Sequence, residues 1–228
     1  MKSQNQGLHL TPPWIISLNS DFYPIKQSII SGLISFPYNY GTFAGLMEIK
    51  EFNYSANFCE ENIWHLCQNQ ELEGFSKKVL IISNAKRNCP FKFQKSINGD
   101  EVVWWNYHVV LLAENKDSSF VYDFDSTLRI PATAKEYFSR TFDFSSNEQV
   151  VDSPFFKVID SVSYLDSFNS DRSHMKDSSG KWISDPPKWQ IIGGGGELPL
   201  PELLDFTESS KHQIYSLDEI WPHELSLI

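Results

Sequence analysis

The stretch EVVWWNYHVVLLAENKDSSFVYDFDST, residues 101–127, decides the fold that this sequence predicts. Its two halves, 101–113 and 118–127, are rich in β-branched and aromatic residues, which is typical of strands. The polar residues ENKD between them are typical of a turn, so the pattern indicates an antiparallel hairpin. Two further segments fit the same sheet, because 77–84 has the pattern of a buried strand and 154–168 that of a strand running into a helix.

The predicted hairpin places a histidine and an aspartate on one face of the sheet. A four-residue turn at 114–117 puts His108 opposite Asp123, and a shift of the turn by one residue puts His108 opposite Asp125. Opposed side chains lie about 5 Å apart at Cβ. Both registers therefore predict a histidine base that a carboxylate orients, with a buried histidine of purely structural role as the alternative.

A second motif, FCEENIWHLC at residues 58–67, predicts a helix with a cysteine in its first turn. Asn57 is a suitable N-cap and Glu60 stands at capping-box spacing, which makes Cys59 the second helical residue. Unpaired N–H groups and the positive end of the helix favour a thiolate there. Glu60 and Glu61 lie on other sides of the helical wheel but their charge opposes the thiolate, so a nearby imidazolium is needed to outweigh them. The alternative is a buried, inert cysteine.

Composition excludes several classes of protein and site. The 228 residues carry a formal net charge of −10, which argues against nucleic acid as a partner. The sequence holds neither an apolar run long enough to span a membrane nor the apolar core of a signal peptide. The three cysteines, Cys59, Cys67 and Cys89, form no CxxC pair, so we expect free thiols in a reducing compartment and no structural metal site.

A cysteine at a helix start, followed along the chain by a histidine and an aspartate on paired strands, is the order found in papain-like and transglutaminase-like thiol enzymes. Five segments carry a further resemblance: FCEENIWHLC, VLIISN, WWNYHVVLL, VYDFDSTLRIP and SDRSHMKDSSGKWISDPP. Through them the sequence resembles, over about residues 54 to 220, the protein N-terminal glutamine amidohydrolases. Phe58 and Asn106 depart from the family pattern, which has Tyr and Asp at these positions.

This resemblance implies an α/β (α+β) fold of the papain-like or transglutaminase-like cysteine hydrolases, in which an antiparallel sheet packs on a helix that carries the nucleophile at its N-terminus. It implies a monomeric enzyme that needs neither a cofactor nor a metal. The implied reaction deamidates the side chain of an N-terminal glutamine on proteins and peptides, leaving an N-terminal glutamate that feeds the Arg branch of the N-degron pathway. A cytoplasmic location follows, with the nucleus as an additional expectation.

The resemblance also assigns catalytic roles, to Cys59 as nucleophile, His108 as base and Asp123 as the orienting carboxylate. It thereby selects the register that pairs His108 with Asp123. Rival interpretations are another papain-like thiol enzyme, such as a peptidase or a transglutaminase, and a module that binds N-termini without catalysis. Residues 1–50 are expected to form an N-terminal extension, and residues 51–228 a single catalytic domain.

A free α-ammonium group on the substrate requires an acceptor in the site. Glu60 and Asp125 are the carboxylate candidates, with helix capping and bracing of the hairpin as their alternative roles. Arg172 and His174 are further candidate substrate-binding residues, because they belong to the unusual polar segment DRSHMKDSSG. The alternative for that segment is an ordinary solvated loop.

Overall fold

The computed structural model describes residues 52–97, 101–145, 152–193 and 198–220. These residues fall in one compact unit, Glu51–Ile228, and the expected N-terminal extension lies outside them. They form a mixed α/β structure with a mostly antiparallel sheet, which confirms the α+β class expected from the sequence. Within the described ranges, every helix is too short or too polar to cross a bilayer.

The largest element is a six-stranded sheet in the order β10-β7-β1-β4-β5-β6, with each neighbouring pair antiparallel. The predicted strand 77–84 is confirmed as β1, at the centre of this sheet. The six strands are β1 (Ser76–Ser83), β4 (His108–Glu114), β5 (Ser119–Tyr122), β6 (Ala132–Thr133), β7 (Phe155–Asp160) and β10 (Ile214–Ser216).

Helices and smaller strand pairs complete the described structure. Segment 154–168 forms a strand and then a helix, as predicted. The helices are α1 (Cys59–Cys67), α2 (Ala134–Thr141), α3 (Ser161–Ser167) and α4 (Leu200–Leu203), with 3-10 turns η1 (Gln70–Leu72) and η2 (Ser173–Met175). The small sheets pair β2 (Cys89–Phe91) with β3 (Val103–Trp105), and β8 (Phe168–Asn169) with β9 (Leu198–Pro199).

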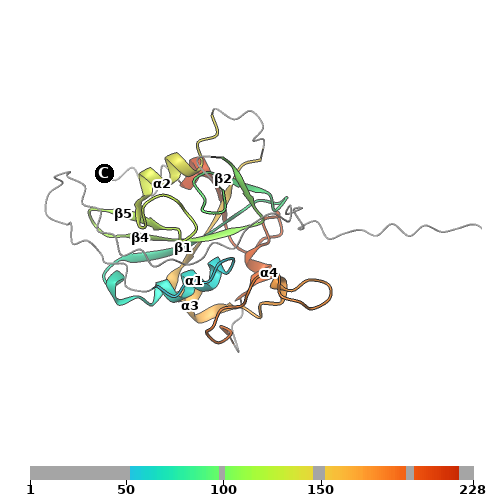
Figure 1. Cartoon of the computed structure of the whole chain (residues 1–228). Helices are drawn as coiled ribbons and strands as arrows, with labels where there is room; N and C mark the ends of the chain where they lie inside the picture. The colour runs from blue at the N-terminus through green and yellow to red at the C-terminus, as the bar shows by residue number, and fades with distance from the viewer. Residues whose placement is uncertain (1–51, 98–100, 146–151, 194–197, 221–228) are drawn as a thin grey trace, which may run out of the picture. The chain divides into compact units, whose positions relative to one another are not determined.

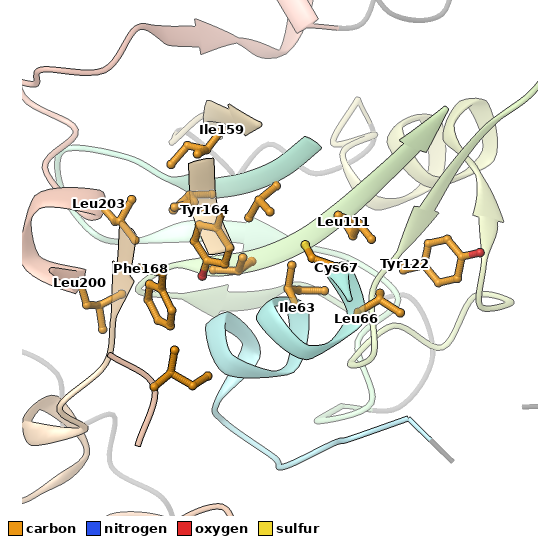
Figure 2. Close-up of a cluster of buried hydrophobic side chains, with 14 of the residues drawn as sticks. Ile63, Leu66, Cys67, Leu111, Tyr122, Ile159, Tyr164, Phe168, Leu200 and Leu203 are labelled. Atoms are coloured by element: carbon orange, nitrogen blue, oxygen red, sulfur yellow. The ribbon is translucent and has the colours of Figure 1, made fainter. Parts of the chain in front are cut away.

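Alternation along the central strands divides the core into two layers. Val79 and Ile81 of β1 face α1 and α3, whereas Leu80 and Ile82 face α2. Figure 1 shows α1 and α3 on one side of the sheet and α2 on the other. Figure 2 shows the first layer, to which α1 contributes Ile63, Leu66 and Cys67. Burial of each large aliphatic side chain stabilises the fold by about 1.5–3 kcal/mol, so both helix layers are firmly held on the sheet.

The hairpin forms, but in the other of the two registers. Leu112 pairs with Val121 and Glu114 with Ser119, so the register that the resemblance selected is wrong. Ladder pairing ends at Tyr122, and the chain then turns sharply, with the Ser126 N–H donating to the Asp123 carbonyl at 3.3 Å. This turn brings Asp123 back toward β4 without strand pairing.

The first half of the hairpin is not one strand. It divides into β3 and β4, which belong to different sheets. The reason lies in β1, whose last partner on β4 is His108, so the residues before His108 have no ladder partner there and pair with β2 instead. The Ser83 hydroxyl donates to the Asn106 carbonyl at 2.6 Å across this break. His108 is consequently the first residue of β4.

Candidate active site

Helix α1 begins one residue later than expected. Asn57 has a left-handed φ of 66°, and Phe58 occupies the N-cap position without a side-chain capping bond, so the predicted Asn57 cap and capping box are wrong. The helix start is braced instead by Asn62, whose side-chain amide accepts from the Ser55 N–H at 2.8 Å and donates to the Ser55 carbonyl at 2.9 Å. Cys59 is therefore the first helical residue, still within reach of the positive end of the helix.

The Cys59 thiol lies between the helix start and β4. It is partly exposed, and its sulfur accepts a hydrogen bond from the Val109 N–H, which places the thiol beside the residue that follows His108. The thiol also donates to Oε2 of Glu60 at 3.5 Å. Burial first, and then the negative charges of Glu60 and Asp125, raise the pKa of Cys59 well above its ordinary value. The resting state of this cysteine is thus a neutral thiol.

His108 and Asp123 form a buried pair. Nε2 of His108 donates to Oδ1 of Asp123 at 2.7 Å, and both side chains are at most 2% exposed. Burial alone would lower the pKa of His108, but the charge and hydrogen bond of Asp123 outweigh it and raise that pKa. Burial likewise opposes ionisation of Asp123, but the contact with His108 lowers its pKa overall. The pair is therefore suited to hold an imidazolium against a carboxylate.

Asp123 is held by three further donors that the sequence did not predict. Its Oδ2 accepts from the Tyr137 hydroxyl at 2.9 Å and from Nε2 of Gln94 at 3.2 Å, and its Oδ1 accepts from the Asp125 N–H at 2.9 Å. The Trp105 indole donates to Gln94 at 3.2 Å and stacks on the His108 ring at 5.5 Å between centroids. These residues come from separate elements with no shared local pattern, so no periodicity could have found them.

Glu60 joins the cluster from the second position of α1. Its side chain bends back toward the thiol and is fully buried, contrary to the helical-wheel expectation that it points elsewhere. Oε2 accepts from the Tyr107 hydroxyl at 3.1 Å, whereas Oε1 has no hydrogen-bond partner and lies 3.5 Å from Nε2 of His174. Because Tyr107 donates its single proton to Glu60, its oxygen accepts from Nε2–H of His174 at 3.2 Å. A polar chain thus runs from the thiol to the partly exposed His174.

Arg172 lies away from the thiol, on the other acid of the helix start. Its Nε and Nη2 each donate at 2.7 Å to the buried carboxylate of Glu61, a bidentate pair. Ser170 and the Trp189 indole donate to the same carboxylate at 2.9 and 2.6 Å. This ion pair fastens segment 170–190 to α1, so the structure places Arg172 in a bracing position and His174 beside Glu60.

Asp125 lies near the thiol, but its carboxylate already accepts a hydrogen bond. Its Oδ1 accepts from the Tyr54 hydroxyl at 2.6 Å. Ligand atoms of Asp125, Asp123 and His108 lie within 4.8 Å of one another, which would permit a metal ion. The hydrogen bonds of all three residues give each of them a role that requires no metal.

The other two cysteines lie elsewhere. Cys67 is buried in the layer under α1, and burial raises its pKa to about 12. Cys89 is buried on the opposite layer, where burial and then the charge of Asp152 raise its pKa. Cys89 is the first residue of strand β2. Cys59 is therefore the one partly exposed thiol of the three.

Comparison with known proteins identifies the family of this chain. A family model described as N-terminal glutamine amidase matches residues 54–222. The protein N-terminal glutamine amidohydrolase of Bos taurus is 36% identical over 173 residues, which are 73% of this chain and 84% of that protein. The proteins of the same name from Homo sapiens and Danio rerio are each 39% identical, over 62% and 61% of this chain and 72% and 71% of their own lengths. The chain therefore belongs to the N-terminal glutamine amidase family.

Proposed function

We propose that this protein hydrolyses the side-chain amide of an N-terminal glutamine on proteins and peptides, releasing ammonia and leaving N-terminal glutamate. The observation that carries the proposal is the buried His108–Asp123 pair next to the thiol-bearing start of α1, in a chain of this family. Membership of the family supports the substrate, and the geometry supports a thiol mechanism.

In this mechanism Cys59 is the nucleophile and His108 the base. Asp123 occupies Nε2 of His108, which leaves Nδ1 as the nitrogen that takes the thiol proton. Thiolate attack on the carboxamide carbon gives a tetrahedral oxyanion, which the Cys59 N–H and neighbouring N–H groups at the start of α1 stabilise. The imidazolium then gives its proton to the departing ammonia, and a water activated by the same histidine hydrolyses the thioester.

Recognition of the free N-terminus is assigned to Glu60 and His174. Oε1 of Glu60 is a fully buried carboxylate oxygen without a donor, and such a group is costly unless a partner completes it. An α-ammonium group supplies both the proton and the opposite charge. Asp125, already bonded to Tyr54, contributes longer-range attraction, and Arg172 acts through the position of segment 170–190.

The wider proposal follows the family resemblance. The sheet with α1 on one face supports a papain-like or transglutaminase-like architecture, with the protein acting as a monomer without cofactor. The N-terminal glutamate that it produces is an acceptor for arginylation, which places the reaction at the entry to the Arg branch of the N-degron pathway. A reporter that begins with glutamine should therefore become short-lived in cells only when this protein is active.

The decisive experiment measures ammonia from peptides that begin with Gln, Asn or acetyl-Gln. We expect release from the free Gln peptide alone, loss of release in Cys59→Ala, and retained release in the matched control Cys67→Ala. Wild-type rates in Cys59→Ala would overturn the nucleophile assignment. Backbone cleavage would identify a peptidase, cross-linking to an amine a transglutaminase, and peptide binding without ammonia a non-catalytic module.

A further inference from the structure

The resting geometry of the thiol raises a problem for catalysis. Cys59 donates its proton to Glu60, a carboxylate, rather than to a base that would activate it. A fixed negative charge at hydrogen-bond distance stabilises S–H and destabilises S⁻. Without a change at Glu60, the nucleophile would stay in its unreactive form.

The other contacts of the Glu60 carboxylate indicate how its negative charge can be neutralised. The carboxylate is fully buried, Oε2 is shared between the thiol and Tyr107, and Oε1 accepts no hydrogen bond. His174, 3.5 Å from Oε1, is the one basic side chain of the described residues that approaches it within ion-pair distance, and its Nε2 proton is directed to Tyr107. The site therefore holds, next to the nucleophile, a buried carboxylate oxygen that accepts no hydrogen bond and has the partly exposed His174 beside it.

We propose that Glu60 is a switch operated by the substrate: it holds the Cys59 thiol proton in the free enzyme, and the α-ammonium group of a bound substrate takes over its carboxylate and releases the thiol. The proton then passes from sulfur to Nδ1 of His108, so that a neutral thiol and imidazole become a thiolate and an imidazolium. This inference rests on the proposed function, because it assumes a substrate with a free α-amino group.

Other groups around the thiol do not substitute for the ammonium. The titratable side chains that act on it besides Glu60 are Tyr54, Tyr107, Tyr164 and Asp125, with His108 adjacent through the Val109 contact. Burial and nearby negative charges raise the pKa of all three tyrosines, so they remain neutral at physiological pH. The charge of Asp125 adds to that of Glu60 in opposing the thiolate. The Val109 N–H favours the thiolate, and among the titratable side chains only a protonated His108 would add to that effect, with its charge partly offset by Asp123.

With this switch, the charge of the substrate's N-terminus affects the rate of the reaction as well as the binding of the substrate. An acetylated N-terminus carries no charge, so an acetyl-Gln peptide would enter with the thiol still held as S–H. A free cysteine with an exposed, ionised sulfur is oxidised and alkylated easily, whereas this one remains inert until a substrate arrives. The same carboxylate thus selects the substrate and protects the nucleophile.

Alkylation of Cys59 by iodoacetamide tests the switch without any turnover. The rate follows the thiolate fraction, which changes about tenfold per pH unit below the thiol pKa. In Glu60→Gln, which preserves the shape of the side chain, we expect a lower pH midpoint and at least about tenfold faster alkylation at pH 7. Asp125→Asn is the matched control, with a smaller shift, because it removes a charge that does not contact the thiol. Cys59→Ala identifies the modified residue, and melting curves verify that each variant is folded.

A second alkylation experiment adds a peptide that carries the α-ammonium group. A glycine-initiated peptide carries the α-ammonium but leaves the side-chain space open for iodoacetamide, and its N-acetyl form is the control. The free peptide should accelerate alkylation in the wild type, and neither peptide should do so in Glu60→Gln. An unchanged midpoint in Glu60→Gln, or an equal wild-type response to the two peptides, including no response, overturns the switch. Since ammonia release is measured separately, an active amidohydrolase without the switch and an inactive protein with it are distinguishable outcomes.

Discussion

Nε2 of His108 donates to Oδ1 of Asp123 at 2.7 Å, although Asp123 lies one residue beyond the last paired residue of β5. The contact depends on the turn after Tyr122 and on the donors that hold the carboxylate, rather than on strand register. The position of the Asp123 carboxylate is therefore sensitive to the loss of any one of its hydrogen bonds.

Asp123→Asn should lower kcat by about 10²- to 10⁴-fold, because an amide can neither orient the imidazole in the same tautomer nor stabilise its charge. Asp125→Asn makes the same replacement of a carboxylate oxygen by an amide nitrogen, and it should cost much less, since Asp125 contacts Tyr54 rather than His108. Steady-state ammonia release compares the two. A larger loss in Asp125→Asn would mean that the wrong carboxylate has been assigned to the histidine.

The pair should also make stability depend on pH. The raised pKa of His108 contributes stability that is complete below its unfolded pKa of about 6.5 and is lost as pH rises through the folded value. The lowered pKa of Asp123 contributes stability that is present above about 3.9 and is lost as pH falls through its folded value. Both contributions coexist between about pH 4 and 6.5.

We therefore expect the difference in Tm between wild type and Asp123→Asn to be largest near pH 5.5 and to shrink toward pH 9. Thermal melts in a series of buffers measure it, with Asp125→Asn as the reference for an isosteric change in the same turn. A difference that stays constant from pH 5.5 to 9 would contradict the charged pair.

Gln94→Leu tests the second contact of Asp123. The change removes the donor to Oδ2 and the acceptor of the Trp105 indole, and a hydrogen bond to a charged group is worth about 1.5–3 kcal/mol. We expect kcat to fall about tenfold or more with KM within about twofold, because the residue acts on the orientation of the base and not on the substrate. Gln94→Glu keeps an acceptor for the Trp105 indole but removes the N–H donor to Asp123. Comparison of the two variants therefore distinguishes the contact with Trp105 from the contact with Asp123. An increase of KM at unchanged kcat would place Gln94 in substrate binding instead.

Arg172→Met should markedly lower the free energy of unfolding. It leaves Glu61 buried without its bidentate partner, a change that costs about 3–5 kcal/mol. Lys211→Met is the control, because Lys211 is 75% exposed and its pair with Glu202 should contribute little. Denaturant unfolding measures both. The double variant Arg172→Met with Glu61→Gln should lose less than the sum of the single changes, and strict additivity would argue against a coupled pair.

The sequence predicted the main sheet and helix because hydrophobic patterns are strong where both layers of the core pack. β1, β7 and α3 fall where their patterns indicated, whereas the predicted strand 101–113 is divided into β3 and β4. The register was harder, since moving the turn by one residue leaves the composition of both strands unchanged. The structure places the turn at Asn115–Ser118, where the Asn115 N–H donates to the Ser118 carbonyl at 2.9 Å.

Predictions of single side chains failed where tertiary contacts decided the outcome. Asn57 had the right residue type for an N-cap but adopts a left-handed conformation, and its side chain donates to Ser184. Glu60 was placed by the helical wheel, yet Tyr107, 47 residues away, holds it against the thiol. Arg172 stays a predicted contact of the substrate, but its ion pair with Glu61, 111 residues away, was not anticipated. No local pattern records such distances.

Three elements each place a candidate catalytic side chain at one of their ends: Cys59 opens α1, His108 opens β4, and Asp123 follows β5 directly. The hydrophobic residues that hold these elements together lie farther along each of them. The segments that join the elements at this end carry Gln94, Trp105 and Tyr107, so exchange of such a segment must preserve these three side chains if the reactive groups are to keep their positions.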